Sequence, residues 1–433
     1  MSKYVKIFFQ ALIICSIYFL LTYIARIDFI RSGYSDFSFN VMNMLTYKIK
    51  QKTDSSNILI VLFDDFFLKK NHLVNKYGEP LYGYNFPRKY IASVIKILDK
   101  NEKDKHVSPK ALFIDYDFSF TMMPGGKELS KWDKKLIDVL AHDRNYVIII
   151  PEIYSFNFIK DSKNKKIRQM IKEKKIVFVS PSFFKNNDGN VKRYAPVVTI
   201  GDKKYENLIL KMYRLDKNKS IVIDDKTLYS TDILFKGYDG SYSYWENVYK
   251  CGILDFVAKN FYRNKINGSF IFLGSSYSFN NDKYEIFPFF SPMFNGVEIL
   301  ANAYETLVFF NGYIKIYTWK NFIIVYLLIV LLVVILENIN ERILKNNEFL
   351  EKINYAKKKI KTCFKYRLLK KLFSEAVVII ALSFLVSIIC LYVFKIWIDY
   401  MLIFLAFTVY DVLKNMGFRF YDCLKQKKII VKE

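Results

Sequence analysis

The chain has 433 residues, of which 52% are hydrophobic, 18% aromatic and 25% charged, and its formal net charge is +25. This length exceeds one small domain, and the mixture of apolar and charged residues fits neither a wholly soluble nor a wholly membrane-embedded protein. The positive charge does not indicate nucleic-acid binding, because much of it follows apolar runs and the rest is scattered lysine without interleaved aromatic residues. We therefore expect no nucleic-acid partner.

Cysteine and histidine usage excludes two further classes of site. Cys251 is the only cysteine between the first two long apolar runs, so an internal disulfide cannot form in that segment. The sequence has no C-x-x-C pair, and its histidines, His72, His106 and His142, lack the spacing of zinc ligands. We therefore expect no metal ion and no cofactor.

Four apolar runs approach or reach the ~20 residues that cross a bilayer. We predict transmembrane segments over residues 7–26, 317–337, 374–395 and 397–415. Two lysines precede the first run as in a signal peptide, but no small-x-small cleavage site follows it. We predict an uncleaved anchor, and a cleaved signal peptide is the alternative.

Basic residues indicate the orientation of these segments. Lysine and arginine are abundant in residues 338–373 and 416–433, and basic loops stay in the cytoplasm. The predicted topology therefore has cytoplasmic residues 1–6, 338–373 and 416–433 and an extracytoplasmic domain over 27–316. The run Lys357–Lys371 could contact anionic lipid or a protein partner, or it could be a solvated amphipathic face.

Strand and helix patterns alternate between the first two apolar runs. Short aliphatic runs predict strands, and apolar residues at helical spacing predict helices. The alternation predicts an α/β domain with a mainly parallel sheet covered by helices. The predicted strands are 57–63, 111–114, 146–150, 175–179, 221–223, 233–235 and 269–273, and the predicted helices begin at Pro87-Arg88 or cover 127–142, 162–174, 205–215, 251–260 and 296–310.

Paired acids follow the first two strands. Asp64 and Asp65 end one strand, and Asp115 and Asp117 end the next. Right-handed crossover geometry places these strand ends at one edge of the sheet, where open α/β sheets bind ligands. Clustered carboxylates suit a hard cation, or the hydroxyls and amines of a small solute. The alternative is that these acids cap helices and pair with Arg88 or with nearby lysines.

Three further residues are candidates for the same ligand site. Ser275 ends another predicted strand within Gly274-Ser-Ser276, but no activating base or G-x-S-x-G motif supports a nucleophile, so we expect a turn and no enzyme. Arg88 either pairs with a strand-end acid or faces a ligand. Asn302 is expected to be a polar anchor between a helix and a loop.

The predicted strands, helices and strand-end acids, in this order, resemble a CHASE2 domain, an extracytoplasmic sensory module of bacterial membrane receptors. The resemblance covers about Tyr34 to Tyr313 and includes the layout of one anchor before the domain and three spans after it. Asp282 stands where the family often carries an acid. Tyr84 and Phe86 replace the usual tryptophan, and no cyclase, kinase or similar output domain follows the last span. The matching pieces are Ile58–Asp65, Pro87-Arg88, Lys110–Asp115, Asp188-Gly189 through Pro196, Phe270–Gly274 and Gly296–Asn302.

The resemblance implies a multi-pass protein of the bacterial inner membrane with a sensor on its outer side. Such a sensor would bind an unidentified small-molecule or ionic signal and act on a separate cytoplasmic or membrane effector; a homodimer is possible. The helix from Gly296 leads toward the next span, and Asn311-Gly312 between them permits a kink. The alternatives are a structural or assembly subunit of a cell-envelope complex and, ranked lower, an extracytoplasmic enzyme.

Overall fold

The computed structural model divides the chain into two compact units, Asn43–Ile314 and a second that combines Met1–Met42 with Lys315–Glu433. The boundary between them falls within α3 (Asp36–Thr46). The residues described are 3–24, 36–81, 86–121, 128–154, 156–185, 191–219, 232–258, 263–277, 282–286, 293–312, 322–336, 338 and 363–414. The predicted strand 221–223 and the predicted turn Asp188-Gly189 lie outside them, as does Lys357–Lys371 apart from the backbone of its second half.

An eight-stranded sheet forms the centre of the unit Asn43–Ile314, in the order β4-β3-β2-β12-β1-β11-β10-β9. Neighbours from β4 to β11 pair in parallel, whereas β10 pairs antiparallel with both β11 and β9. The predicted α/β domain with a mainly parallel sheet is confirmed. The strands are β1 (Ile58–Phe63), β2 (Ala111–Ile114), β3 (Val147–Pro151), β4 (Ile176–Val179), β9 (Tyr238–Asp239), β10 (Tyr242–Ser243), β11 (Val248–Gly252) and β12 (Phe270–Ser275).

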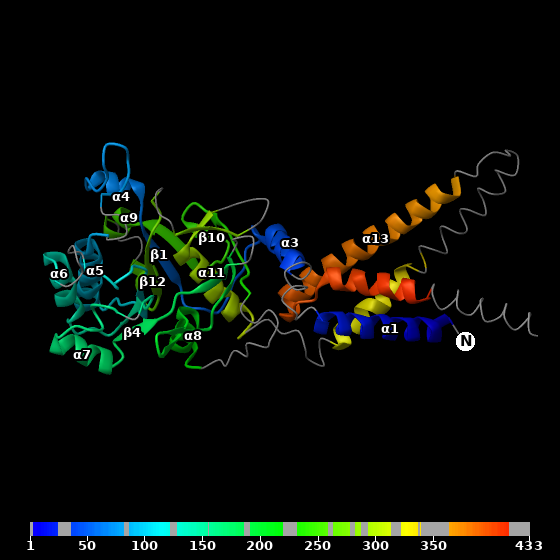
Figure 1. Cartoon of the computed structure of the whole chain (residues 1–433), viewed down its shortest axis with the longest axis horizontal. Coiled ribbons are helices and arrows are strands. Elements are labelled where there is room, and N and C mark those ends of the chain that lie inside the picture. The colour runs from blue at the N-terminus through cyan, green and yellow to red at the C-terminus, as the bar shows by residue number, and fades with distance from the viewer. Residues whose placement is uncertain are drawn as a thin grey trace, which may run out of the picture. The chain divides into compact units, whose positions relative to one another are not determined.

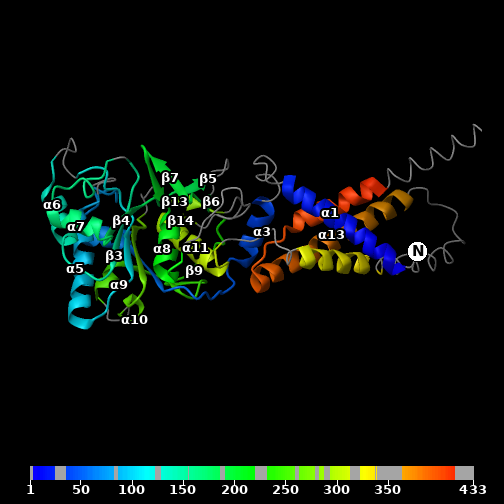
Figure 2. The same cartoon turned by 90° about the horizontal axis from the view of Figure 1, so that it is seen from below.

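Helices cover both faces of this sheet, which explains why its central strands are apolar without alternation. All six residues of β1 are buried. Leu59, Val61 and Phe63 belong to a core cluster with α5 (Arg88–Lys105) and α6 (Lys131–Leu140). On the other side α11 (Gly296–Phe309) packs on β1, β12 and α8 (Leu208–Lys217), and the two groups of helices flank the strands in Figure 1 and Figure 2.

Local signals place most helix starts. Pro87 precedes α5, and the apolar residues at helical spacing, Ile91, Val94, Ile95 and Leu98, are buried. Ser130 and Asp133 form a capping box, so α6 begins at Lys131 rather than near residue 127. Asn164 and Asn207 cap the helices that follow them. The other short helices described in this unit are α4 (Asp65–Lys70), α7 (Lys165–Lys172), α9 (Ile253–Ala258) and α10 (Arg263–Ile266). Three two-stranded antiparallel pairs lie outside the main sheet: β5 (Phe183–Lys185) with β6 (Val191–Tyr194), β7 (Val197–Ile200) with β8 (Lys203–Glu206), and β13 (Lys283–Glu285) with β14 (Met293–Asn295).

The predicted strand 233–235 is wrong, although its residues are buried. Side chains satisfy most of its backbone, although Ile233 N donates to Lys192 O of β6 (2.9 Å). Thr306 Oγ1 accepts from Leu234 N (2.9 Å), Asn302 Oδ1 accepts from Lys236 N (2.7 Å), and Asn43 bonds both Phe235 N and Ile233 O. An apolar run therefore need not enter the sheet when distant side chains supply its hydrogen bonds.

The predicted helix 251–260 is also wrong at its start. Cys251 and Gly252 end β11, a strand missing from the sequence prediction, and α9 begins at Ile253. β11 pairs with β1 over Ile58–Leu62, so the sheet recruits Cys251 and Gly252 before the helix begins. Tyr205 similarly lies in β8, and α8 begins only at Leu208.

The helix α11 begins at Gly296, as predicted, and every one of its residues is buried. The sheet, α8 and neighbouring loops enclose the helix, so it has no solvent-facing side. Phe309 is its last residue, and Asn311 and Gly312 follow with positive φ values of 51° and 131°. The helix therefore ends before the predicted kink.

The helical unit contains α1 (Lys3–Ile24), the helix Phe322–Leu336, α13 (Cys363–Ile389), a π-helical turn (Cys390–Phe394) and a helix over residues 400–414. Their apolar side chains form one cluster, which includes Ile14, Ile329 and Ile403. Tyr4–Ile24 and Ala376–Phe394 are long and apolar enough to cross a membrane, whereas Phe322–Leu336 is shorter. Length and composition thus support two of the four predicted spans.

Candidate functional site

The strand-end acids lie at the carboxyl edge of the sheet, but three of them contribute to local structure. Asp64 caps α4, with its Oδ1 accepting from Phe67 N at 2.7 Å. Asp65 lies in the first turn of that helix, where a negative charge is stabilising. Asp117 accepts from Ser119 N at 2.7 Å. Asp64 and Asp65 thus correspond to the capping alternative, whereas Asp117 stabilises a turn.

Asp115 differs from these three acids, because it lies in the electrostatic field of Asp282. Burial, together with the charge of Asp282, raises the pKa of Asp115 well above its usual range. Asp282 Oδ2 in turn accepts from Gly296 N at 3.0 Å, and a Cβ at Gly296 would lie 2.5 Å from that oxygen. Glycine at position 296 thus lets the carboxylate of Asp282 approach the start of α11.

Arg88 is buried and pairs with Asp133, a residue that the sequence analysis did not single out. The two side chains are 3% and 0% exposed. The guanidinium also donates to the carbonyls of Phe120 and Asp117, and it lies 4.5 Å from the ring centroid of Phe158. Burial lowers the pKa of Arg88, and the charge of Asp133 opposes that shift. Arg88 is therefore a structural ion-pair partner, but its partner lies on α6 and not at a strand end.

Asn302 and Ser275 are also enclosed. Asn302 Oδ1 accepts from Lys236 N (2.7 Å) and Trp245 Nε1 (3.0 Å), and its Nδ2 donates to Glu298 O (2.8 Å). The amide thus joins α11 to the loop before β9, and no ligand is needed to satisfy it. Ser275 is buried as the last residue of β12, opposite Phe63 of β1, so the strand extends further than the predicted turn.

A cavity of about 570 Å³ lies at the same sheet edge, beside the start of α11, and we call it the edge cavity. Strand ends, a hairpin and the helix start converge on it, as expected of ligand sites in open α/β sheets. Its volume falls in the range of small-molecule sites, ~300–1,000 Å³. It is lined by Tyr47, Tyr238, Lys250, Ser276, Lys283, Met293, Phe294, Asn295 and Glu298.

Charged groups and aromatic rings share the walls of the edge cavity. Lys250 Nζ lies 2.8 Å from Glu298 Oε1 and 4.3 Å from the ring centroid of Tyr238. Glu298 Oε2 accepts from both the backbone and side-chain nitrogen of Asn295 (2.8 and 2.9 Å), so this carboxylate is fully engaged. Among the described residues no carboxylate pairs with Lys283. Lys283 is therefore the ammonium group of the cavity without a carboxylate partner in the described part of the chain.

The aromatic wall is formed around Phe294. Its ring centroid lies 6.2 Å from that of Tyr47 and 6.0 Å from that of Tyr238. Burial, with the nearby charge of Glu298, raises the pKa of Tyr47 to about 12, so the phenol stays neutral at physiological pH. The Asn295-x-x-Glu298 spacing is a capping-box pattern that could have pointed to this wall, whereas nothing local marks Lys250 or Lys283.

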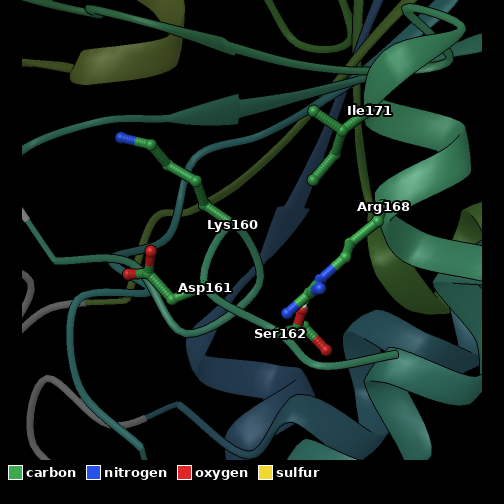
Figure 3. Close-up of a pocket in the computed structure, with 5 residues that line it drawn as sticks. All are labelled: Lys160, Asp161, Ser162, Arg168 and Ile171. Carbon is green, nitrogen blue, oxygen red and sulfur yellow. Dashed lines mark hydrogen bonds between the residues drawn. The ribbon is translucent and has the colours of Figure 1, made fainter. Parts of the chain in front are cut away.

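A second cavity, of about 420 Å³, lies near the end of β3 and the start of α7 and is lined by Lys160, Asp161, Ser162, Arg168 and Ile171. Figure 3 shows Arg168 reaching toward Ser162 while Lys160 extends away from both. Arg168 Nε donates to Ser162 O at 3.0 Å. Lys160 pairs with Glu152 and donates to Tyr205 Oη at 2.5 Å. Both cations are thus engaged, and this cavity is the weaker ligand candidate.

Within the described ranges, no three His, Cys, Asp or Glu side chains lie close enough to hold a metal ion. Comparisons with family models, with curated proteins and with solved structures found no match. The resemblance to a CHASE2 domain therefore has no support beyond the residues quoted for it. The function must be argued from the edge cavity and its position in the fold.

Proposed function

We propose that the protein is a membrane-anchored receptor whose unit Asn43–Ile314 binds a small anionic solute in the edge cavity. The bound state would pass through α11 to the apolar helices and then to a separate effector. In this proposal the chain crosses the bacterial inner membrane four times, with the sensory unit on its outer side. The observation that carries the proposal is a cationic, aromatic-walled cavity at the start of the helix that leads toward Phe322–Leu336.

The lining residues favour an anion with an apolar body. Lys283 would supply the ammonium that meets the charge, and Lys250, paired with Glu298, would offer a further N–H donor. The rings of Tyr47, Tyr238 and Phe294 offer apolar faces for a sugar ring or an aliphatic chain. Solutes of this class include sugar acids, sugar phosphates and dicarboxylates.

The cavity supports binding better than catalysis. A nucleophile requires an activating base or a lowered pKa. Burial instead raises the pKa of Tyr47, and Lys250 is held as an ion pair. We therefore propose no enzymatic step.

Ligand-induced stabilisation of the full chain in lipid nanodiscs tests this function. A panel of sugar acids, sugar phosphates and dicarboxylates should contain at least one compound that raises the melting temperature in a saturable manner. Lys283→Ala should weaken that compound's affinity at least about tenfold, the cost of one charge-assisted hydrogen bond. Lys203→Ala, which changes an exposed lysine of β8, should not. Equal weakening by both variants would contradict the assignment of the site.

An assembly subunit is the second candidate, favoured by an exposed apolar patch. Phe120, Ile153, Tyr154 and Phe156 follow the neighbouring strands β2 and β3 and are 57%, 44%, 54% and 47% exposed. The rings of Phe120 and Tyr154 lie 6.1 Å apart. Such patches on soluble domains commonly contact other proteins. If no solute stabilises the chain, and if Phe120→Ser with Tyr154→Ser releases a co-purifying protein, this candidate replaces the receptor.

A further inference from the structure

Glu305 lies near the end of α11, where two hydroxyl groups from the segment before β1 hold its carboxyl group. Thr53 Oγ1 lies 2.5 Å from Glu305 Oε2, and Ser55 Oγ lies 2.6 Å from Oε1. The two hydroxyl oxygens are themselves 2.8 Å apart. No part of Glu305 is exposed. Glu305 thus joins a segment near the start of the unit to a helix near its end.

A count of protons indicates which form of Glu305 fits this arrangement. Three oxygen–oxygen contacts join Glu305, Thr53 and Ser55, and each needs one hydrogen to be a hydrogen bond. The two hydroxyls supply only two hydrogens, and a carboxylate supplies none. All three contacts are hydrogen bonds only when Glu305 carries a proton. When Glu305 is ionised, one contact brings two lone pairs together.

The amide of Asn247 does not change this count. Its Nδ2 carries two hydrogens and lies within hydrogen-bond distance of Thr53 Oγ1 (3.0 Å), Ser55 Oγ (3.2 Å) and the Thr53 carbonyl (2.9 Å). These bonds occupy lone pairs on both hydroxyls and bring no hydrogen to the contact between them. Ser55 N also donates to Thr53 Oγ1 (3.3 Å), and neither nitrogen supplies the hydrogen that the third oxygen–oxygen contact lacks.

The electrostatic surroundings act in the same direction. Burial raises the pKa of Glu305 to about 7, against the hydrogen bonds from Ser55 and Thr53. On α8, the charge of Asp216 adds to this rise and that of Lys217 opposes it. Burial acts to raise the pKa of Asp216, yet hydrogen bonds from Lys110, Ser56 and Tyr304 lower it to about 2, so Asp216 stays ionised.

The remaining titratable neighbours do not neutralise an ionised Glu305. Asp54 is mostly exposed and lies 3.3 Å from Lys217, so it draws on the same ammonium group as Asp216. Burial raises the pKa of Tyr304 and of Tyr238, and both phenols are uncharged at neutral pH. The only cation acting on Glu305 is therefore shared with two other carboxylates in the described part of the chain.

We propose that Glu305 is a proton-operated latch that joins α11 to Thr53–Ser55 when protonated and loosens when it ionises. The joint lies close to both ends of the unit, since the segment of Thr53 runs back to Asn43 and α11 runs on to Ile314. Those are the two points where the chain continues toward the apolar helices. With the unit on the outer side of the membrane, as proposed above, the latch would make the external pH a second input beside a solute in the edge cavity.

The test compares melting temperatures of the full chain in nanodiscs from pH 5 to pH 8. Glu305→Gln keeps the shape, cannot ionise and donates a hydrogen bond as the protonated acid does. In the folded wild type the pKa of Glu305 is raised from its ordinary value of 4.5 to about 7. Protonated Glu305 therefore contributes its full stabilisation below pH 4.5, and this contribution is lost as the pH rises through 7. Relative to Glu305→Gln, the wild type should lose about 4 °C between pH 5 and pH 8.

Asp54→Asn is the matched control, because it removes a neighbouring carboxylate whose side chain is exposed. It should keep the wild-type pH dependence. Identical pH dependence of wild type and Glu305→Gln would overturn the proposal.

Hydrogen exchange in the wild type alone provides a test that needs no variant. The amides of Ser55 and Ser56 donate to Thr53 Oγ1 (3.3 Å) and Asp216 Oδ2 (3.2 Å). After correction for the intrinsic rate, their protection should fall at least about tenfold between pH 5.5 and 8 if the latch opens. Unchanged protection would likewise overturn the proposal.

Discussion

The buried ion pair between Arg88 and Asp133 gives the largest expected effect of a single substitution. Asp133→Asn keeps the side-chain shape and removes one charge, which leaves the Arg88 guanidinium uncompensated in the core. The new amide group must also face a donor, because Asp133 accepts from Ser130 N (2.9 Å) on one oxygen and from Arg88 on the other. Breaking a buried pair in this way costs about 3–5 kcal/mol.

The corresponding change in melting temperature follows from the size of the unit. Unfolding entropy is roughly 2.1 cal/mol/K per residue, so about 270 residues give about 0.6 kcal/mol/K. A loss of 3–5 kcal/mol therefore lowers the melting temperature by about 5–9 °C. Circular dichroism of the full chain in detergent measures this shift. Asp138→Asn, on the exposed side of α6, is the control and should shift the transition by about 1 °C or less.

A shift below about 2 °C for Asp133→Asn would refute this reasoning. It would mean that the carbonyls of Phe120 and Asp117, with the rings of Phe118 and Phe158, suffice to hold the buried charge of Arg88.

Two further substitutions test how α11 and its neighbours are packed. Gly274→Ala would place a Cβ 2.7 Å from Val297 Cγ1 and should destabilise the unit by about 1–3 kcal/mol; if Val297→Ala in the same chain does not recover part of that loss in urea unfolding, the steric explanation fails. Burial lowers the pKa of Lys236, whose ammonium donates to Thr46 O at 2.8 Å, to about 7. The unfolded chain then binds more protons than the folded one between pH 7 and 10.5, so stability relative to Lys236→Met should rise with pH by about 1.4 kcal/mol per unit. Parallel pH–stability curves for the two proteins would contradict a buried Lys236.

Elements set by local chemistry were predicted correctly. β1 follows from an uninterrupted aliphatic run, α5 from a proline at its start and a clear apolar stripe, and α11 from Gly296 onward. In each case the residues that decide the structure lie within one or two turns of one another. Alternating strands and helices then suffice to predict a parallel sheet.

The failures involve partners that are distant in the sequence. Residues 233–235 have the composition of a strand, but the side chains of Asn43 and Thr306 supply most of their hydrogen bonds. Arg88 finds its partner on another helix, at Asp133. No local pattern marks such pairs, because strand order and crossovers decide which segments become neighbours.

The edge cavity was missed for the same reason. The prediction of a site at the carboxyl edge named the acids that end β1 and β2, whereas the cavity lies beside β11, β12 and α11. Lys250 comes from β11, a strand missing from the prediction, and Lys283 comes from a short hairpin. Asp64 and Asp117 lie at the edge where the cavity is found, but Asp64 caps α4 and Asp117 stabilises a turn. The predicted topology identified the carboxyl edge of the sheet, but it did not identify the strands that border the cavity.

The two proposed inputs act on one helix, and this has a thermodynamic consequence. Glu298 forms part of the edge cavity at one end of α11, and Glu305 receives the hydroxyls of Thr53 and Ser55 two turns later. If a solute and a proton both favour one position of α11, each must strengthen the binding of the other by the same factor. A solute that binds more tightly at pH 5.5 than at pH 8 would then raise the pKa of Glu305. If it favours the other position, it would bind more weakly in acid and lower that pKa. Glu305→Gln should abolish the pH dependence in either case, so the sign of the dependence reveals which position of α11 the solute selects.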